Sequence, residues 1–90
     1  MQNYQFYDLG KLKGGETVEI KMIGNSANVR LMNEKNYRNY TVGQSYKFVG
    51  GLATQSPVRL SIPEKGHWFV VVDMQGLQGT VNVSVSVIGV

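Results

Sequence analysis

The sequence contains no cysteine and only one histidine among its 90 residues. Without cysteine the chain has no disulfide framework, no thiolate metal site and no cysteine nucleophile. The single histidine, His67, excludes zinc sites built from histidine pairs and leaves room for one histidine-based catalytic dyad at most. No Gly-x-Ser-x-Gly motif supplies a serine for such a dyad. We therefore expect no enzymatic activity, no bound metal and no cofactor.

Long hydrophobic runs and dense charge are also missing. The longest apolar run, Trp68 to Val72, has five residues, far fewer than a membrane span needs. Nine Lys and Arg residues against six Asp and Glu residues give a net charge of +3, and these charges are interspersed. This balance lacks the dense basic field of a dedicated nucleic-acid binder. The first ten residues show no basic segment followed by an apolar one, so we expect a cytoplasmic protein without a secretory signal.

What the sequence has instead is a polar/apolar alternation with a period of two. Residues 17–22, 57–62 and 80–87 alternate in this way, which indicates strands with one buried and one solvated face. The run 68–72 is apolar at every position, so we expect a central strand covered on both sides, with Trp68 as a core residue and not a stacking platform beside His67. The predicted strands lie near residues 3–8, 17–23, 27–32, 45–49, 57–62, 67–74 and 79–88.

Glycine-rich turn signals separate these strands and define the fold class. The pattern predicts one all-β domain over residues 1–90, an antiparallel and jelly-roll-like β-sandwich of about seven to eight strands. A five-stranded oligonucleotide-binding barrel is the alternative, although the strand count is high for it. No segment predicts a convincing amphipathic helix. Residues 34–40 form one or two helical turns at most, and their asparagines favour a loop.

The segment 33–40 is also the strongest candidate for a binding site. Tyr37, Arg38 and Tyr40 combine rigid aromatic area with adaptable hydrogen bonding, which is typical of binding surfaces. The alternative is a long connection between sheets whose tyrosines close one end of the sandwich. We select these three residues as candidate contact residues.

Three cations occupy solvated positions on separate predicted strands. If the strands of Arg30, Lys47 and Arg59 share one sheet, the three cations form a stripe. Together with the nearby tyrosines, this stripe would be suited to binding single-stranded nucleic acid. The alternative is that they are ordinary outward charges paired with Glu19 or Asp73. Arg30 and Arg59 therefore complete the set of candidate binding residues.

Several motifs resemble a known bacterial family. They are Tyr-Gln-Phe-Tyr-Asp-Leu-Gly at 4–10, Gly-Gly-Glu at 14–16, Asn-Ser-Ala-Asn-Val-Arg-Leu-Met at 25–32, Gly-Gly-Leu at 50–52, Ser-Pro-Val-Arg-Leu at 56–60, Pro63, Gly-His-Trp at 66–68 and Val-Val-Val-Asp at 70–73. Together they resemble the family catalogued as domain of unknown function number 1883, along nearly the whole chain. That resemblance implies an all-β fold, no assigned activity, and an accessory or sensing role in bacterial defence, because some members carry a Toll/interleukin-1 receptor domain. More loosely, the order of elements is similar to Golgi-dynamics and pre-peptidase C-terminal modules, which bind partners or carbohydrate.

The sequence therefore predicts a non-catalytic binding or self-association module. Its partner would be another protein or a second copy of the chain, because the edges of an open sandwich are available for strand addition. A module that binds single-stranded nucleic acid is the less favoured alternative.

Overall fold

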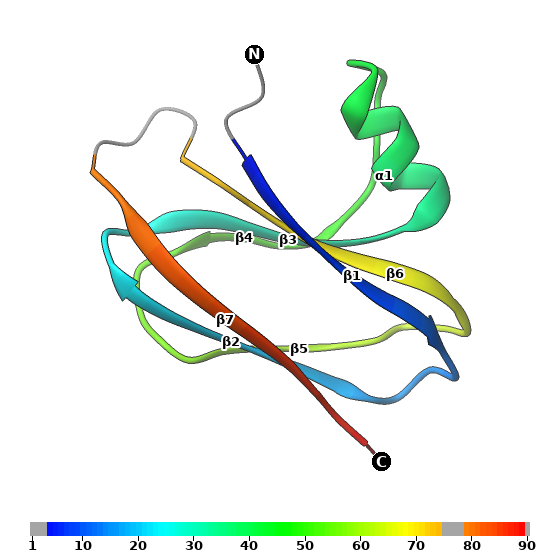
Figure 1. Ribbon diagram of the computed structural model, residues 1–90. Helices are drawn as coiled ribbons and strands as arrows, with labels where there is room; N and C mark the ends of the chain where they lie inside the picture. The colour runs from blue at the N-terminus through cyan, green and yellow to red at the C-terminus, as the bar shows by residue number, and fades with distance from the viewer. Residues whose placement is uncertain (1–3, 75–78, 90) are drawn as a thin grey trace.

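Seven strands and one helix make up the part of the chain that the computed structural model describes, residues 4–74 and 79–89 (Figure 1). The strands form two antiparallel sheets, one of four strands in the order β1-β6-β3-β4 and one of three in the order β5-β2-β7. The sheets stack face to face without closing into a barrel, which confirms the predicted sandwich. The elements are β1 (Tyr4–Leu12), β2 (Thr17–Gly24), β3 (Ala27–Asn33), α1 (Glu34–Thr41), β4 (Val49–Ala53), β5 (Val58–Ser61), β6 (Gly66–Asp73) and β7 (Val81–Ile88).

The main core lies between the two sheets and follows from the alternation in the sequence. On β2, Val18 and Ile20 are fully buried. On the facing sheet, Val29 and Leu31 of β3 are buried in the same cluster. Val83 of β7, the strand next to β2, packs against this cluster. Each fully buried side chain of this size contributes roughly 1.5–3 kcal/mol relative to an exposed one. The one-sided pattern of these strands is therefore what holds the two sheets together.

Strand β6 lies at the centre of the four-stranded sheet, between β1 and β3, as its two-sided apolar run predicts. Val70 and Val72 belong to the core between the sheets. Phe69 and Val71 point to the opposite side and form a second buried cluster with Met32. The predicted core position of Trp68 is also confirmed, since 6% of this residue is exposed.

The interpretation of residues 34–40 as a loop is wrong, because these residues form most of helix α1. Figure 1 shows α1 on the side of the four-stranded sheet that faces away from the three-stranded sheet. Tyr37 and Tyr40 of this helix pack on the second cluster. Asparagine content argued for a loop, but Asn33 supplies the N-cap of the helix, a position at which asparagine is strongly preferred.

The strand predicted over 45–49 is also displaced, because β4 begins at Val49 and includes the glycine pair that suggested a turn. Gly50 has φ of +117° and Gly51 has φ of +146°, a backbone conformation that glycine adopts far more readily than other residues. A Cβ atom at Gly50 would collide with the carbonyl oxygen of Val29 on the neighbouring strand. Gly50 therefore allows β4 to lie close to β3, and the glycine pair does not end the strand.

Candidate functional site

Helix α1 starts from a local hydrogen-bond arrangement that its sequence encodes. The Asn33 side-chain oxygen accepts a hydrogen bond from the backbone N–H of Asn36 at 3.0 Å. Glu34 stands in the first turn and lies 3.5 Å from Arg38 one turn later, an i,i+4 ion pair. The Thr41 hydroxyl donates to the carbonyl oxygen of Arg38 at 2.7 Å in the last turn. These contacts define a helix of about two turns that carries the three candidate contact residues.

The predicted contact residues come together on α1 but point in different directions. The Tyr37 ring stacks on Phe69, with 4.3 Å between ring centroids and an interplanar angle of 11°. Burial raises the pKa of Tyr37 to about 12. Arg38 instead projects into solvent, with 76% of its side chain exposed. Tyr37 is therefore mainly a packing residue, whereas Arg38 is accessible.

Tyr40 reaches a buried polar cluster on the same side of the sheet. Its hydroxyl donates to Asp73 at 3.1 Å, and burial is the main cause of the raised pKa of Tyr40, with the Asp73 carboxylate adding to it. Asn28 also donates to Asp73, at 3.0 Å, and the Arg30 guanidinium forms an ion pair with it. The guanidinium carbon of Arg30 lies 5.3 Å from the centre of the Phe48 ring. Arg30 is thus engaged within the fold, with 15% of its side chain exposed.

The predicted cationic stripe is not formed. Arg30 lies on β3 of the four-stranded sheet, whereas Arg59 lies on β5 of the three-stranded sheet. The Arg59 side chain donates to Glu19 at 3.0 Å, as the alternative interpretation expected. Lys47 precedes β4, and its backbone N–H donates to the Asn36 side chain at 2.8 Å. The strands of these cations do not share one sheet, so the geometry on which the nucleic-acid interpretation depended is absent from the described residues.

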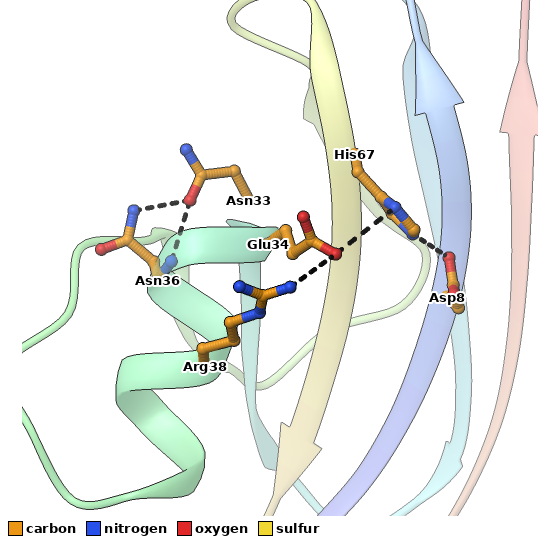
Figure 2. Close-up of polar contacts among 6 residues, drawn as sticks. All are labelled: Asp8, Asn33, Glu34, Asn36, Arg38 and His67. Carbon is orange, nitrogen blue, oxygen red and sulfur yellow. Dashed lines mark hydrogen bonds and ion pairs between the residues drawn. The ribbon is translucent and has the colours of Figure 1, made fainter.

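His67, at the start of β6, joins β1 to α1 (Figure 2). Its Nε2 lies 2.6 Å from Oδ1 of Asp8 on β1, and its Nδ1 lies 3.9 Å from Oε2 of Glu34 on α1. The ring is parallel to that of Phe69, at a centroid distance of 4.9 Å. The hydrogen bond from His67 lowers the pKa of Asp8, and the backbone N–H of Gly10 lowers it further. We call Asp8, His67 and Glu34 the histidine bridge.

The histidine bridge is the arrangement that sequence reasoning missed. The sequence pattern suggests only two functional roles for His67, a stacking platform with Trp68 or a general base in need of a serine or cysteine partner. Its neighbours are instead two carboxylates that lie 59 and 33 positions away in the sequence. No motif links residues at such separations, so only the pairing of β1 with β6 and the position of α1 reveal the bridge.

Two of the four sheet edges carry features that discourage further strand pairing. Strand β1 has a shift of register between Asp8 and Gly10, and it also carries the charge of Lys11. Strand β4 has five residues, two of which are the positive-φ glycines Gly50 and Gly51. Bulges, charges and short length are recognised means by which proteins protect an exposed edge.

The other two edges belong to the three-stranded sheet and differ from one another. Strand β5 has four residues, and Pro57 and Pro63 stand shortly before and after it. Strand β7 has eight residues, all paired with β2 in unbroken register. Its sequence, Val-Asn-Val-Ser-Val-Ser-Val-Ile, contains no charge, proline or glycine. Among the described residues β7 pairs with β2 alone, so its second edge is the least protected one in the fold.

A comparison with known protein families gives one match. The model of the family described as Domain of unknown function (DUF1883) matches residues 2–89. The chain belongs to this family. The match confirms the resemblance drawn from the sequence motifs, and in this DUF1883 member the motif Gly-His-Trp contains the histidine of the bridge. No curated protein and no solved structure matches the chain.

Two further observations concern the described part of this DUF1883 member. Residues 4–74 and 79–89 contain no group of three His, Cys, Asp or Glu side chains placed to hold a metal ion. The same residues include no helix that is long and apolar enough to cross a membrane.

Proposed function

We propose that the chain is a non-catalytic module that self-associates by pairing the β7 edges of two copies. The observation that carries the proposal is the contrast between β7, which is long, uncharged and regular, and the three protected edges. An unprotected edge presents a row of backbone N–H and C=O groups that pair readily with another strand. The partner in this proposal is a second copy, because β7 complements itself.

The self-complementarity follows from the pattern of β7. Antiparallel pairing about a two-fold axis at Ser84 sets Val83 opposite Val85 of the other copy and Asn82 opposite Ser86. Directly opposite residues of antiparallel strands share a face, so all valines stay on the core side and all polar residues on the outer side. No like charges meet across the axis. Val87, which is 38% exposed in one chain, would be covered next to the partner strand.

The same pairing supports an accessory role of the kind that the family resemblance implies. Two three-stranded sheets would join into one sheet across the axis and hold two chains in a fixed orientation. Any domain attached to the chain would then be brought next to its counterpart on the second copy. Because such pairing would bring attached domains together, the proposed role of the module is an accessory or sensing one in bacterial defence.

The direct test is the molar mass in solution as a function of concentration. Size-exclusion chromatography with light scattering, from about 10 µM to about 1 mM, should show a concentration-dependent shift from monomer to dimer. Ser84→Glu should abolish the shift, because two carboxylates would face each other across the axis. Within one chain the new side chain lies opposite Lys21 on β2, so the fold should be retained.

The matched control is Ser61→Glu, which adds the same charge to an exposed position on the other edge of the same sheet. This variant should dimerise like the parent chain. A parent chain that stays monomeric up to about 1 mM would overturn the proposal. Equal loss of dimer in both variants would show that net charge, and not the β7 edge, governs association.

The register can be tested separately because the chain has no native cysteine. Ser84→Cys should form an intermolecular disulfide under mild oxidation, since the two sulfur atoms would lie directly across the axis. Ser86→Cys is the control, because its two copies would be four residues apart along the strands, about 13 Å. Disulfide formation by Ser86→Cys and not Ser84→Cys would reject this register.

A further inference from the structure

The histidine bridge places one imidazole between carboxylates from two other elements. Figure 2 shows the ring of His67 with Asp8 on one side and Glu34 on the other. The ring nitrogens lie 2.6 Å and 3.9 Å from the nearest oxygens of these two residues. The His67 side chain is 27% exposed, so solvent protons reach it.

This arrangement distinguishes the two charge states of histidine. A protonated imidazole carries an N–H on both ring nitrogens and can face a carboxylate on each side. A neutral imidazole keeps one N–H, which the short contact with Asp8 takes up, and turns a lone pair toward Glu34. The attraction between His67 and Glu34 is therefore present only when His67 carries a proton. Histidine is the side chain that ordinarily changes charge between pH 5 and 8.

The helix that Glu34 belongs to depends on few contacts. Helix α1 has eight residues, well below the about 12–15 residues at which isolated helices become marginally stable. None of its residues is fully buried. It is held by the Asn33 cap, by the hydrogen bond from Lys47 to the Asn36 side chain, by the ring contacts of Tyr37 and Tyr40, by the bond from Tyr40 to Asp73 and by the Glu34 contact with His67. The loss of one of these contacts shifts the balance between a docked and an open helix.

Other charged groups around His67 do not replace the missing attraction. Lys11 lies directly opposite His67 in the pairing of β1 with β6. Lys65 lines, with Lys11 and His67, a hollow of about 400 Å³. Arg38 contacts Glu34 in either charge state of His67, since the two lie one turn apart on α1. The groups that face the ring are thus Asp8 and Lys11 from β1, Lys65 from the preceding turn, and Glu34 with its partner Arg38 from α1.

We propose that His67 is a pH-sensitive lock for α1, with the protonated imidazole holding the helix on the sheet and the neutral imidazole loosening it. Opening of α1 would uncover the cluster of Met32, Phe69 and Val71 and the aromatic rings around it. The region lies on the outer side of the four-stranded sheet, so this inference is independent of pairing through β7. The protonation state of His67 would thus change the fraction of molecules in which this apolar surface is exposed.

Amide hydrogen exchange of the α1 backbone, followed by NMR from about pH 5 to about pH 8, measures this equilibrium. After correction for intrinsic exchange rates, protection in α1 should fall about two- to fivefold across this range, the size expected for a partly exposed ion pair. The imidazole signals report the charge of His67 without ambiguity, because the chain has one histidine. An imidazole that does not titrate in this range, or protection that stays constant, would overturn the proposal.

Two variants separate the lock from a general effect of pH. Glu34→Gln removes the carboxylate that faces Nδ1 but leaves the Asn33 cap, so the protection of α1, after correction for intrinsic exchange rates, should no longer depend on pH. Glu19→Gln is the control, since Glu19 contacts Arg59 and Lys21 on the three-stranded sheet and should leave the pH dependence intact. A pH dependence that survives in Glu34→Gln would assign it to another group.

Discussion

At the scale of single residues, Asp73 shows how the fold accommodates a buried charge. It is 4% exposed, and its carboxylate receives donors from Asn28, Arg30 and Tyr40. A buried carboxylate is tolerated when it is paired and hydrogen-bonded. If one partner is removed, the lost hydrogen bond no longer compensates for the removal of the carboxylate from water, and the folded state is destabilised. Arg30 and Tyr40, which the sequence pattern suggests as contact residues, both interact with this acid in the structure.

Tyr40→Phe should therefore destabilise the chain by about 1–3 kcal/mol, because it removes one donor from a buried carboxylate and retains the ring. Urea unfolding followed by circular dichroism measures the change. Tyr46→Phe is the control, since its hydroxyl makes no hydrogen bond to a protein group among the described residues and its ring also packs edge-on against Tyr40. Equal effects of the two variants would contradict the role assigned to the Tyr40 hydroxyl.

At the scale of elements, the turn between β1 and β2 is organised by one acidic side chain. The Glu16 carboxylate accepts the backbone N–H groups of Lys13 at 2.9 Å and Gly14 at 2.7 Å. Its backbone oxygen accepts the N–H of Ile62 at 2.8 Å, next to β5. The hydrogen bonds that the carboxylate accepts, that from Lys13 first and that from Gly14 after it, lower the pKa of Glu16. Glu16 thereby links the turn to the edge of the three-stranded sheet.

A lowered pKa in the folded state means that the Glu16 carboxylate stabilises the fold above its ordinary pKa, and that this contribution is lost as pH falls through the lowered value. Glu16→Gln should consequently reduce the free energy of unfolding at about pH 7 and make little difference at about pH 2. Urea unfolding at both pH values tests this. Glu64→Gln, at an exposed turn position, should change stability at neither pH. A Glu16→Gln effect of the same size at both pH values would contradict the assignment.

The elements also show where sequence reasoning was sound and where it failed. Strands with strict alternation, such as β2 and β7, were placed correctly because burial of one face fixes both their type and their register. The predicted position of β4 is wrong because turn statistics place a turn at its glycine pair, whereas both glycines lie within the strand and Gly50 permits close approach to β3. Helix α1 was missed because propensity is a weak guide to eight residues, and the helix depends on a cap and on packing.

At the scale of the whole molecule, the central strand β6 of the four-stranded sheet is buried on both sides. One side faces the three-stranded sheet, and the other is covered by α1 and the aromatic residues around it. Val71, at the centre of the second cluster, is fully buried. The protein thus adds a small second core to a sandwich of only 90 residues.

Val71→Asp should abolish cooperative unfolding, because an unpaired charge in a fully buried position costs more than about 4 kcal/mol. Such a loss is a large part of the roughly 5–15 kcal/mol that stabilises a small domain. The fluorescence of Trp68, the only tryptophan, should shift to the red. Val42→Asp, at a position 68% exposed, is the control and should melt like the parent chain. A cooperative melt of Val71→Asp near that of the parent would show that the second cluster contributes little.

The sequence by itself determined the all-β class, the central position of β6 and the absence of any cysteine for a disulfide or a thiolate metal site. These features follow from local periodicity and composition, which need no knowledge of distant contacts. Tertiary structure alone decided that Arg30 pairs with Asp73, that His67 lies between two acids, and that β7 is an edge strand. Each of these depends on which strands become neighbours, and that choice is made by the packing of the whole chain.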